Sequence, residues 1–413
     1  MWWGLCLFLF KLGSRRQLDY QLNTDGPEVL RNLNRLANTR QKRRPVNKTL
    51  NYFLGRIGSQ PVTTLRTQLL RRLLRMKVLD GARLQGRFVI AVDGTGFLVF
   101  RYPHCEHCLT QRHGDHTLYM HQALEAKLLG PADTVFSFGT AFIDNRDSAG
   151  TPARANAEER KQDCELKAWR RLAMQVRQDF PQLRLCWSGD GLFACGEGFQ
   201  IAKDSRSDFV FIFKPGRLPS LWADFQGLLP LCPEQRVEVV TPAKVRQVYR
   251  WVEELSYTDT QKRTWKLTAL QCEETQPDGS TTLWAWVTGL KVTRATVVEV
   301  ATKGGRHRWH LENQGFNTQK NSDLNLEHAY SHGQQWPAYY YLLQIAHLLL
   351  QLVEKGSLLR QLALALGRTP LQLFGSLKNM AQRLRDSVRY LRWPAEVYDP
   401  EQASGIQIRL DSS

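Results

Sequence analysis

The stretch RFVIAVDGTG, residues 87–96, says most about the fold of this chain. Five apolar residues in a row, 88–92, end at Asp93, and glycines follow at positions 94 and 96. A short apolar run bounded by glycine is typical of a buried strand. Because residues 97–100 are apolar again, we expect a hairpin that turns at the glycines. Asp93 would then be held rigidly at a sheet edge, a suitable place for an oxygen ligand of a divalent metal.

Two more acidic residues have comparable settings. The apolar run LRLCW, residues 183–187, leads to Asp190, which glycine follows. Glu312 lies four residues after Arg308 in a helix predicted to begin after a break at Gly304-Gly305, so both side chains share one helix face. Taken singly, such an aspartate is more often a turn residue and such a glutamate a solvated one. Together, three acids suffice to hold two divalent ions about 3.5–4 Å apart, an arrangement that serves phosphodiester chemistry.

The pattern between these acids predicts a mixed α/β sheet in three layers. We expect helices over 155–179 and 196–204 and a strand over 209–213, after the first strands. Residues 230–290 have a strand pattern throughout and form a β-rich insertion between the second and third acids. We expect most tryptophans of this insertion to pack in the core, with one available to stack on a DNA base. They are Trp251, Trp265, Trp284 and Trp286.

The charge of the chain indicates an anionic partner. It has 413 residues, with 56 Lys and Arg against 39 Asp and Glu, and a formal net charge of +17. Between residues 31 and 83, 14 residues are basic and Asp80 alone is acidic. A surplus of this kind favours a nucleic acid, although a solvated basic face without a partner is the alternative. The candidate DNA contacts in this region are Arg43, Arg44, Arg71 and Arg72.

Cysteines and histidines are concentrated after the first strands. The pattern Cys105-x2-Cys108-x4-His113-x2-His116 offers two thiolates and two imidazoles, enough for a tetrahedral structural zinc ion. The alternative is a set of polar loop residues near the DNA or of reduced surface thiols. The other cysteines are isolated, which fits reduced intracellular thiols better than a disulfide framework.

Two apolar segments bear on location. Residues 1–10 lack a basic start and a cleavage site, and they are too few to span a bilayer. Polar residues interrupt the run 339–353, which we interpret as a buried core helix. We therefore expect a cytoplasmic protein with no membrane partner.

Three motifs together resemble the DDE transposases of bacterial insertion sequences, in the insertion-sequence-four-like group. They are AVDGTG at 91–96, SGDGLF at 188–193 and RHRWHLENQGFNTQKN at 306–321, and the resemblance covers roughly residues 15–350. It implies that Asp93, Asp190 and Glu312 ligate two catalytic Mg²⁺ or Mn²⁺ ions. Arg308 matches the family's arginine and, with Lys320, would contact phosphate. The family's tyrosine and lysine are replaced here by Gly305 and Gln319.

The resemblance also implies the overall plan. We expect an α/β protein with a ribonuclease-H-like mixed-sheet core at 84–229 and 291–350, interrupted by the all-β insertion at 230–290. A basic helical DNA-binding region would occupy 1–83, and a helical region and tail 351–413. The activity would be cut-and-paste transposition on double-stranded DNA by a homodimer associated with the bacterial nucleoid. A metal-dependent nuclease that does not join DNA, and a catalytically inactive DNA-binding derivative, are the alternatives.

Overall fold

A ten-stranded mixed sheet forms the centre of the computed structural model, which describes residues 1–23, 26–103, 105, 107–145, 164–394 and 407–410. Its strand order is β2-β3-β1-β5-β6-β10-β9-β8-β7, and β4 also pairs with β3. The strands are β1 (Phe88–Phe100), β2 (Leu109–His113), β3 (His116–Leu129), β4 (Val135–Ile143), β5 (Leu185–Gly189), β6 (Asp208–Ile212), β7 (Arg236–Val240), β8 (Arg246–Thr258), β9 (Thr264–Thr275) and β10 (Thr281–Thr288).

The predicted hairpin at the glycines of the opening stretch is wrong. β1 is one strand of 13 residues that runs through Gly94 and Gly96 and pairs antiparallel with β3 along its length. The register shifts between Gly96 and Leu98, so the glycine-rich segment forms a bulge and not a turn. Gly94 serves a close approach, because a Cβ there would collide with the carboxylate of Glu165.

Alternate residues of β1 face two different layers. Phe88, Ile90 and Val92 belong to a hydrophobic cluster that includes α6 (Glu165–Asp179) and α7 (Gly196–Asp204). Val89 and Ala91 belong to another cluster, on the opposite face. The two-residue period of a strand explains this division. Helix α6 ends where the sequence predicts, but it begins only at Glu165, because Cys164 is extended; residues 155–163 lie outside the described residues.

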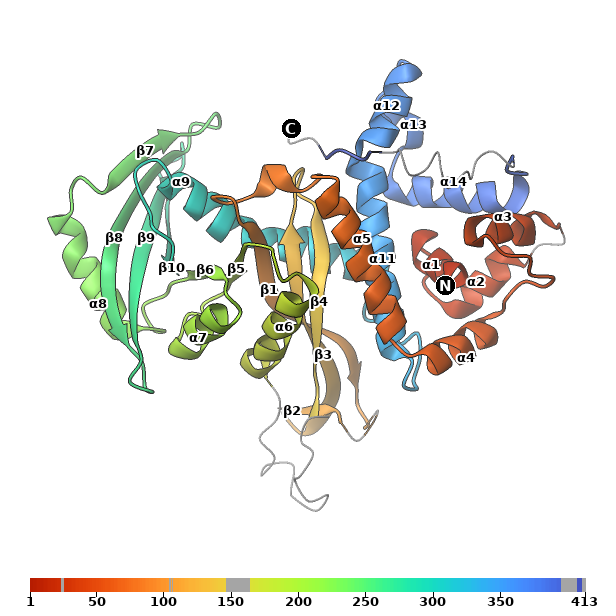
Figure 1. Cartoon of the computed structure of the whole chain (residues 1–413), viewed down its shortest axis with the longest axis horizontal. Helices are drawn as coiled ribbons and strands as arrows, with labels where there is room; N and C mark the ends of the chain where they lie inside the picture. The colour runs from red at the N-terminus through yellow and green to blue at the C-terminus, as the bar shows by residue number, and fades with distance from the viewer. Residues whose placement is uncertain (24–25, 104, 106, 146–163, 395–406, 411–413) are drawn as a thin grey trace.

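The four strands predicted as an insertion extend the core sheet. β7 to β10 are antiparallel neighbours, and β10 pairs antiparallel with β6, with Trp286 opposite Ile212. In Figure 1 they form the end of the sheet farthest from the N-terminus. The segment before them, which the sequence pattern left without an element, folds as α8 (Pro219–Leu228) and η3 (Leu229–Leu231).

One irregular helix covers the second face of the sheet. It runs through α9 (Val297–Glu299), η4 (Val300–Gly305), η5 (Arg306–Arg308), η6 (Leu311–Asn317) and α10 (Thr318–Asn321), and η4 and η6 have the wide π-type turn. The break predicted at Gly304-Gly305 is absent from this described segment, since both residues are helical. The glycines instead let the helix approach the sheet: a Cβ at Gly305 would collide with the indole of Trp286. Turns of the π type occur often at functional sites.

Helices from both ends of the chain gather beside the sheet (Figure 1). α1 (Trp2–Leu9) packs on α11 (Trp336–Lys355), and they share one hydrophobic cluster with residues of the other terminal helices. The two terminal regions, predicted as separate, are therefore joined by a common core. The remaining elements are α2 (Arg15–Leu22), α3 (Glu28–Ala37), α4 (Asn47–Ile57), α5 (Gln60–Arg75), η1 (Asp80–Ala82), α12 (Ser357–Ala365), α13 (Pro370–Phe374) and α14 (Leu377–Tyr390).

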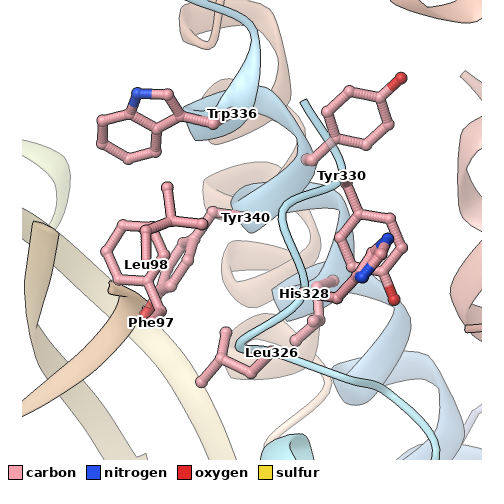
Figure 2. Close-up of a pocket in the computed structure, with 9 residues that line it drawn as sticks. Phe97, Leu98, Leu326, His328, Tyr330, Trp336 and Tyr340 are labelled. Atoms are coloured by element: carbon pink, nitrogen blue, oxygen red, sulfur yellow. The ribbon is translucent and has the colours of Figure 1, made fainter. Parts of the chain in front are cut away.

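An aromatic contact fastens this helical region to the sheet. Figure 2 shows Phe97 and Leu98 of β1 lying against Trp336 and Tyr340 of α11 around a small pocket. The ring centroids of Phe97 are 5.3 Å from Trp336 and 5.1 Å from Tyr340. Within the described residues, one stretch, 336–365, is long and apolar enough to cross a membrane, and 67% of its most apolar window is buried inside the molecule.

Candidate active site

The two aspartates are neighbours on one face of the sheet. β1 and β5 are parallel, and their last registered pair is Ala91 with Ser188. Asp93 and Asp190 each lie two residues further on. Since neighbouring strands are about 4.8 Å apart and side chains repeat every two residues, both carboxylates leave the sheet side by side. They do so on the face that the helix 297–321 covers.

Glu312 reaches this face because the irregular helix is tied to β5. The Ser188 hydroxyl donates a hydrogen bond of 2.5 Å to the carbonyl oxygen of Gly304. Arg306 and Arg308 follow Gly304 in the helix, and the guanidinium of Arg308 contacts the acids. Its Nη1 lies 3.0 Å from Oδ2 of Asp93, and its Nη2 lies 2.6 Å from Oε1 of Glu312. The expected shared face of Arg308 and Glu312 is thus present, with one guanidinium bridging the first and third acids.

The electrostatics show how closely the acids interact. Burial raises the pKa of Asp93 above its usual value, and the negative charges of Asp190 and Glu312 raise it further. The Arg308 guanidinium and the Gly94 N–H, 2.9 Å from Oδ1 of Asp93, act in the opposite direction. Carboxylates that repel one another in this way favour the binding of a cation, which offsets their negative charge.

A fourth acid, which the sequence did not single out, lies near the two aspartates from the face of the sheet that α6 covers. Glu165 begins α6, and its carboxylate lies over the bare backbone of Gly94. Burial raises the pKa of Glu165 to about 7, and the charges of Asp93 and Asp190 act in the same direction. The sequence gives no reason to select Glu165, because acidic residues are common in the first turn of a helix.

The residues after Glu312 divide between the core and the surface. Gln319, where the resembled transposases have a lysine, is fully buried. Its amide nitrogen lies 2.7 Å from Oε1 of Gln344 and 2.9 Å from Nδ1 of His347. Lys320 is partly exposed, and its Nζ pairs with Oε1 of Glu327 at 2.9 Å. The role predicted for Lys320 therefore requires that it exchange this partner for a phosphate.

The predicted DNA contacts in the basic region lie in two places. Arg43 and Arg44 lie between α3 and α4, where Arg44 donates to the carbonyl of Leu22 at 3.2 Å. Arg71 and Arg72 are exposed on α5, and Arg71 donates to the carbonyl of Asp179 at 2.6 Å.

One arginine of this region serves the fold. Arg66 is 2% exposed and donates to Ser137 at 3.1 Å and Thr140 at 2.8 Å. Not every basic residue of the run 31–83 is therefore available to an anionic partner.

The tryptophans separate into core and surface groups. Trp251 and Trp286 are buried, as expected for most of this set, whereas Trp284 is exposed. Trp284 lies with Trp309, which is 48% exposed, beside Arg308 in one pocket. An aromatic surface therefore adjoins the acids.

The predicted zinc ligands are only partly brought together. Cys105 and Cys108 lie close to one another, and the described histidine beside them is His121. His116 is exposed at the turn between β2 and β3 and does not join this group, and the side chain of His113 lies outside the described residues. None of the eight cysteines, all in the described part of the chain, forms a disulfide.

Comparison with known proteins gives a distant structural likeness. No protein-family model and no curated protein matches the chain. Among solved structures, it is similar to a chain in the cryo-EM structure of the piggyBac transposase synaptic complex with hairpin DNA. The TM-score is 0.32 and the identity 7%, over 76% of this chain and 54% of that one. The chain thus spans about half the length of that protein, and a likeness at this level assigns no function by itself.

Proposed function

We propose that this protein is a DNA transposase of the DDE type, with a ribonuclease-H-like core. The observation that carries the proposal is the convergence of three acids from distant parts of the chain. Asp93 and Asp190 leave parallel neighbouring strands on one face, and the helix 297–321 brings Glu312 to that face. Structural needs alone do not require acids at all three positions, because carboxylates that raise one another's pKa disfavour the ionised site.

The donor set suits Mg²⁺ or Mn²⁺. Both are hard cations that prefer carboxylate oxygens with waters and substrate oxygens in the remaining positions. Asp93, Asp190 and Glu312 would hold two such ions, and Glu165, whose charge interacts with both aspartates, would add negative charge nearby. Bound there, the ions would supply charge neutralisation at the scissile phosphate and activate the attacking hydroxyl.

The remaining residues suit a DNA substrate. Arg308 holds two acids through its forked donors, and the same fork binds phosphate oxygens bidentately. Arg43, Arg44, Arg71, Arg72 and Lys320 would add contacts to the DNA backbone. Two element ends must be held together, so a homodimer on DNA follows from the reaction.

The reaction has two balanced steps. In the first, a water oxygen forms a bond to phosphorus at the element end and the 3′-oxygen of the element leaves, which frees a 3′-hydroxyl. In the second, this hydroxyl attacks a phosphodiester of the target, and the target's own 3′-oxygen leaves. A nuclease would perform the first step alone, and this is the second candidate function.

Cleavage of a defined DNA tests the proposal. The substrate is a labelled fragment that carries the reading frame with its natural flanks, incubated with full-length protein and Mg²⁺ or Mn²⁺. We expect cuts at both ends of the element, lost in Asp93→Ala, Asp190→Ala and Glu312→Ala but kept in the exposed turn variant Asp278→Ala. Binding to the fragment should persist in all four.

The outcomes separate the candidates. Joining of pre-cleaved ends to a plasmid favours the transposase over the nuclease. Binding without any cleavage in either metal would indicate an inactive derivative. Full cleavage by any one of the three acid variants would remove that residue from the site.

A further inference from the structure

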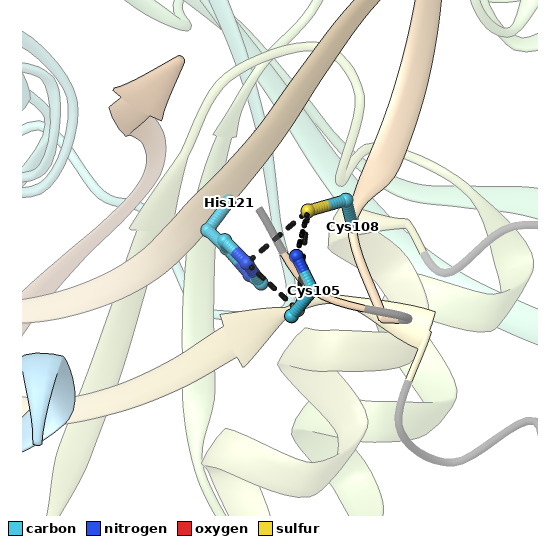
Figure 3. Close-up of side chains that lie close together, drawn as sticks. All are labelled: Cys105, Cys108 and His121. Carbon is cyan, nitrogen blue, oxygen red and sulfur yellow. Dashed lines mark hydrogen bonds between the residues drawn. The ribbon is translucent and has the colours of Figure 1, made fainter. Parts of the chain in front are cut away.

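Three side chains far from the acids converge on one point. Cys105 and Cys108 lie between β1 and β2, and His121 lies on β3 (Figure 3). The two Sγ atoms are 3.9 Å apart. Nε2 of His121 lies 3.4 Å from Sγ of Cys105 and 3.6 Å from Sγ of Cys108. The three ligand atoms thus form a small, nearly regular triangle.

This triangle matches one face of a tetrahedral zinc site. With Zn–S near 2.3 Å and Zn–N near 2.0–2.1 Å, tetrahedral angles place two sulfurs about 3.8 Å apart and a sulfur and a nitrogen about 3.6 Å apart. The observed separations agree with both values to about 0.2 Å. A single ion therefore fits between these atoms without movement of the backbone.

The surroundings are those of a metal knuckle. The N–H of His107 donates to Sγ of Cys105 at 3.4 Å, and the N–H of Cys105 donates to Sγ of Cys108 at 3.3 Å. Donors of this kind favour the thiolate form that binds metal. Cys108 and His121 are buried.

A carboxylate lies behind the histidine. Oδ2 of Asp144, a buried residue just after β4, is 3.9 Å from Nδ1 of His121, the ring nitrogen that faces away from the sulfurs. Metal-binding histidines commonly have a carboxylate at their second nitrogen, which fixes the ring orientation. The imidazole thus presents Nε2 to the two thiols.

We propose that Cys105, Cys108 and His121 bind one Zn²⁺ ion, a site independent of the proposed transposase centre. The described residues supply three of its four tetrahedral positions. The ion would join the segment before β2 to β3. The zinc-bound segment would also be tied to the end of β4, because Asn145 donates two hydrogen bonds to it. The Asn145 N–H donates to the carbonyl of His107 at 2.9 Å, and its Nδ2 donates to the carbonyl of Cys108 at 3.1 Å. Zinc would thereby fix the end of the sheet that packs on Trp336.

Metal analysis of the full-length protein tests this site. Protein purified from zinc-supplemented medium should contain about one zinc per chain by mass spectrometry. Cys105→Ser, Cys108→Ser and His121→Asn should lose it. The matched controls His116→Ala, on the same hairpin, and Cys232→Ser, remote in sequence, should keep it.

Cobalt gives a readout that does not depend on the variants folding. Co²⁺ bound to the unaltered protein should show thiolate-to-metal charge-transfer absorption, which an all-carboxylate site cannot produce, and Zn²⁺ should displace it. Zinc retained in His121→Asn but lost in His116→Ala would overturn the assignment. So would a protein that takes up neither metal.

Discussion

Replacing Glu165 by glutamine tests whether the acids around Asp93 repel one another, because the replacement should change the stability of the protein. Burial raises the pKa of Glu165 from 4.5 to about 7, a difference of 2.5 pKa units, with Asp93 and Asp190 acting in the same direction. One unit corresponds to about 1.4 kcal/mol, so the upper bound is about 3.4 kcal/mol. Because the side chain is partly exposed, solvent screening reduces this to roughly 1–2 kcal/mol.

The sign follows from the direction of the shift. The folded pKa lies above the unfolded one, so folding favours the protonated carboxyl. Its contribution to the free energy of unfolding is intact below pH 4.5, declines between pH 4.5 and about 7, and is lost above that. Glutamine cannot ionise, so Glu165→Gln should match the natural protein at low pH and exceed its stability at pH 8.

Thermal unfolding of metal-free protein measures this difference. An unfolding entropy of about 2.1 cal/mol/K per residue gives roughly 0.9 kcal/mol/K for the chain, so the variant should melt about 1–2 °C higher at pH 8. The exposed residue variant Glu234→Gln should show no such pH-dependent gain. Added Mg²⁺ should stabilise the natural protein more than Glu165→Gln. An equal melting temperature of Glu165→Gln and the natural protein from pH 5 to 8 would refute the reasoning.

Four further variants probe other contacts in the molecule. Arg308→Ala should bind Mn²⁺ about fivefold more tightly, because about 1 kcal/mol of ion pairing with Asp93 and Glu312 no longer competes with the metal, and DNA cleavage should fall. Titration followed by electron paramagnetic resonance measures the affinity for Mn²⁺. An unchanged affinity would contradict the bridge formed by Arg308. Gly305→Tyr, which introduces the tyrosine of the resembled transposases, should destabilise the protein by about 1–3 kcal/mol or more, since its Cβ would collide with Trp286. An unaltered denaturation midpoint would disprove the close approach. Arg66→Ala should lower the free energy of unfolding by about 2–4 kcal/mol, because its buried hydrogen bonds are lost, whereas Arg43→Ala should weaken DNA binding alone. Unfolding and gel-shift assays measure the two effects. The reverse pattern would show that the roles of the two arginines are exchanged.

The sequence predicted the elements more reliably than their connections. The apolar run before Asp93 is a buried strand and α6 ends where its pattern ends, because burial imposes the period of each element. The glycines misled: Gly94 allows a close approach of Glu165, Gly96 lies at a bulge, and Gly304 and Gly305 let the helix approach Val210 and Trp286, so they form neither a turn nor a break. Such a role depends on tertiary neighbours, which no local pattern contains.

The same limit applies to the candidate sites. The spacing of Arg308 and Glu312 was enough to predict their contact, because a helix fixes neighbours four residues apart. Glu165 was not singled out, and His121, noted near the cysteines, was not among the predicted zinc ligands, since the fold brings both to their partners from elsewhere in the chain. Gln319 occupies the position of a lysine in the resembled transposases, and its side chain is buried against Gln344 and His347 of α11.

Counting bound Mn²⁺ ions tests the central claim most directly. Titration of metal-free protein followed by electron paramagnetic resonance should show two Mn²⁺ ions per chain in the natural protein and in the exposed turn variant Asp278→Asn. Asp93→Asn and Asp190→Asn should each lose at least one ion and weaken the other. Two ions bound with unchanged affinity in both variants would contradict the account, because the metals would then lie elsewhere than between these strands.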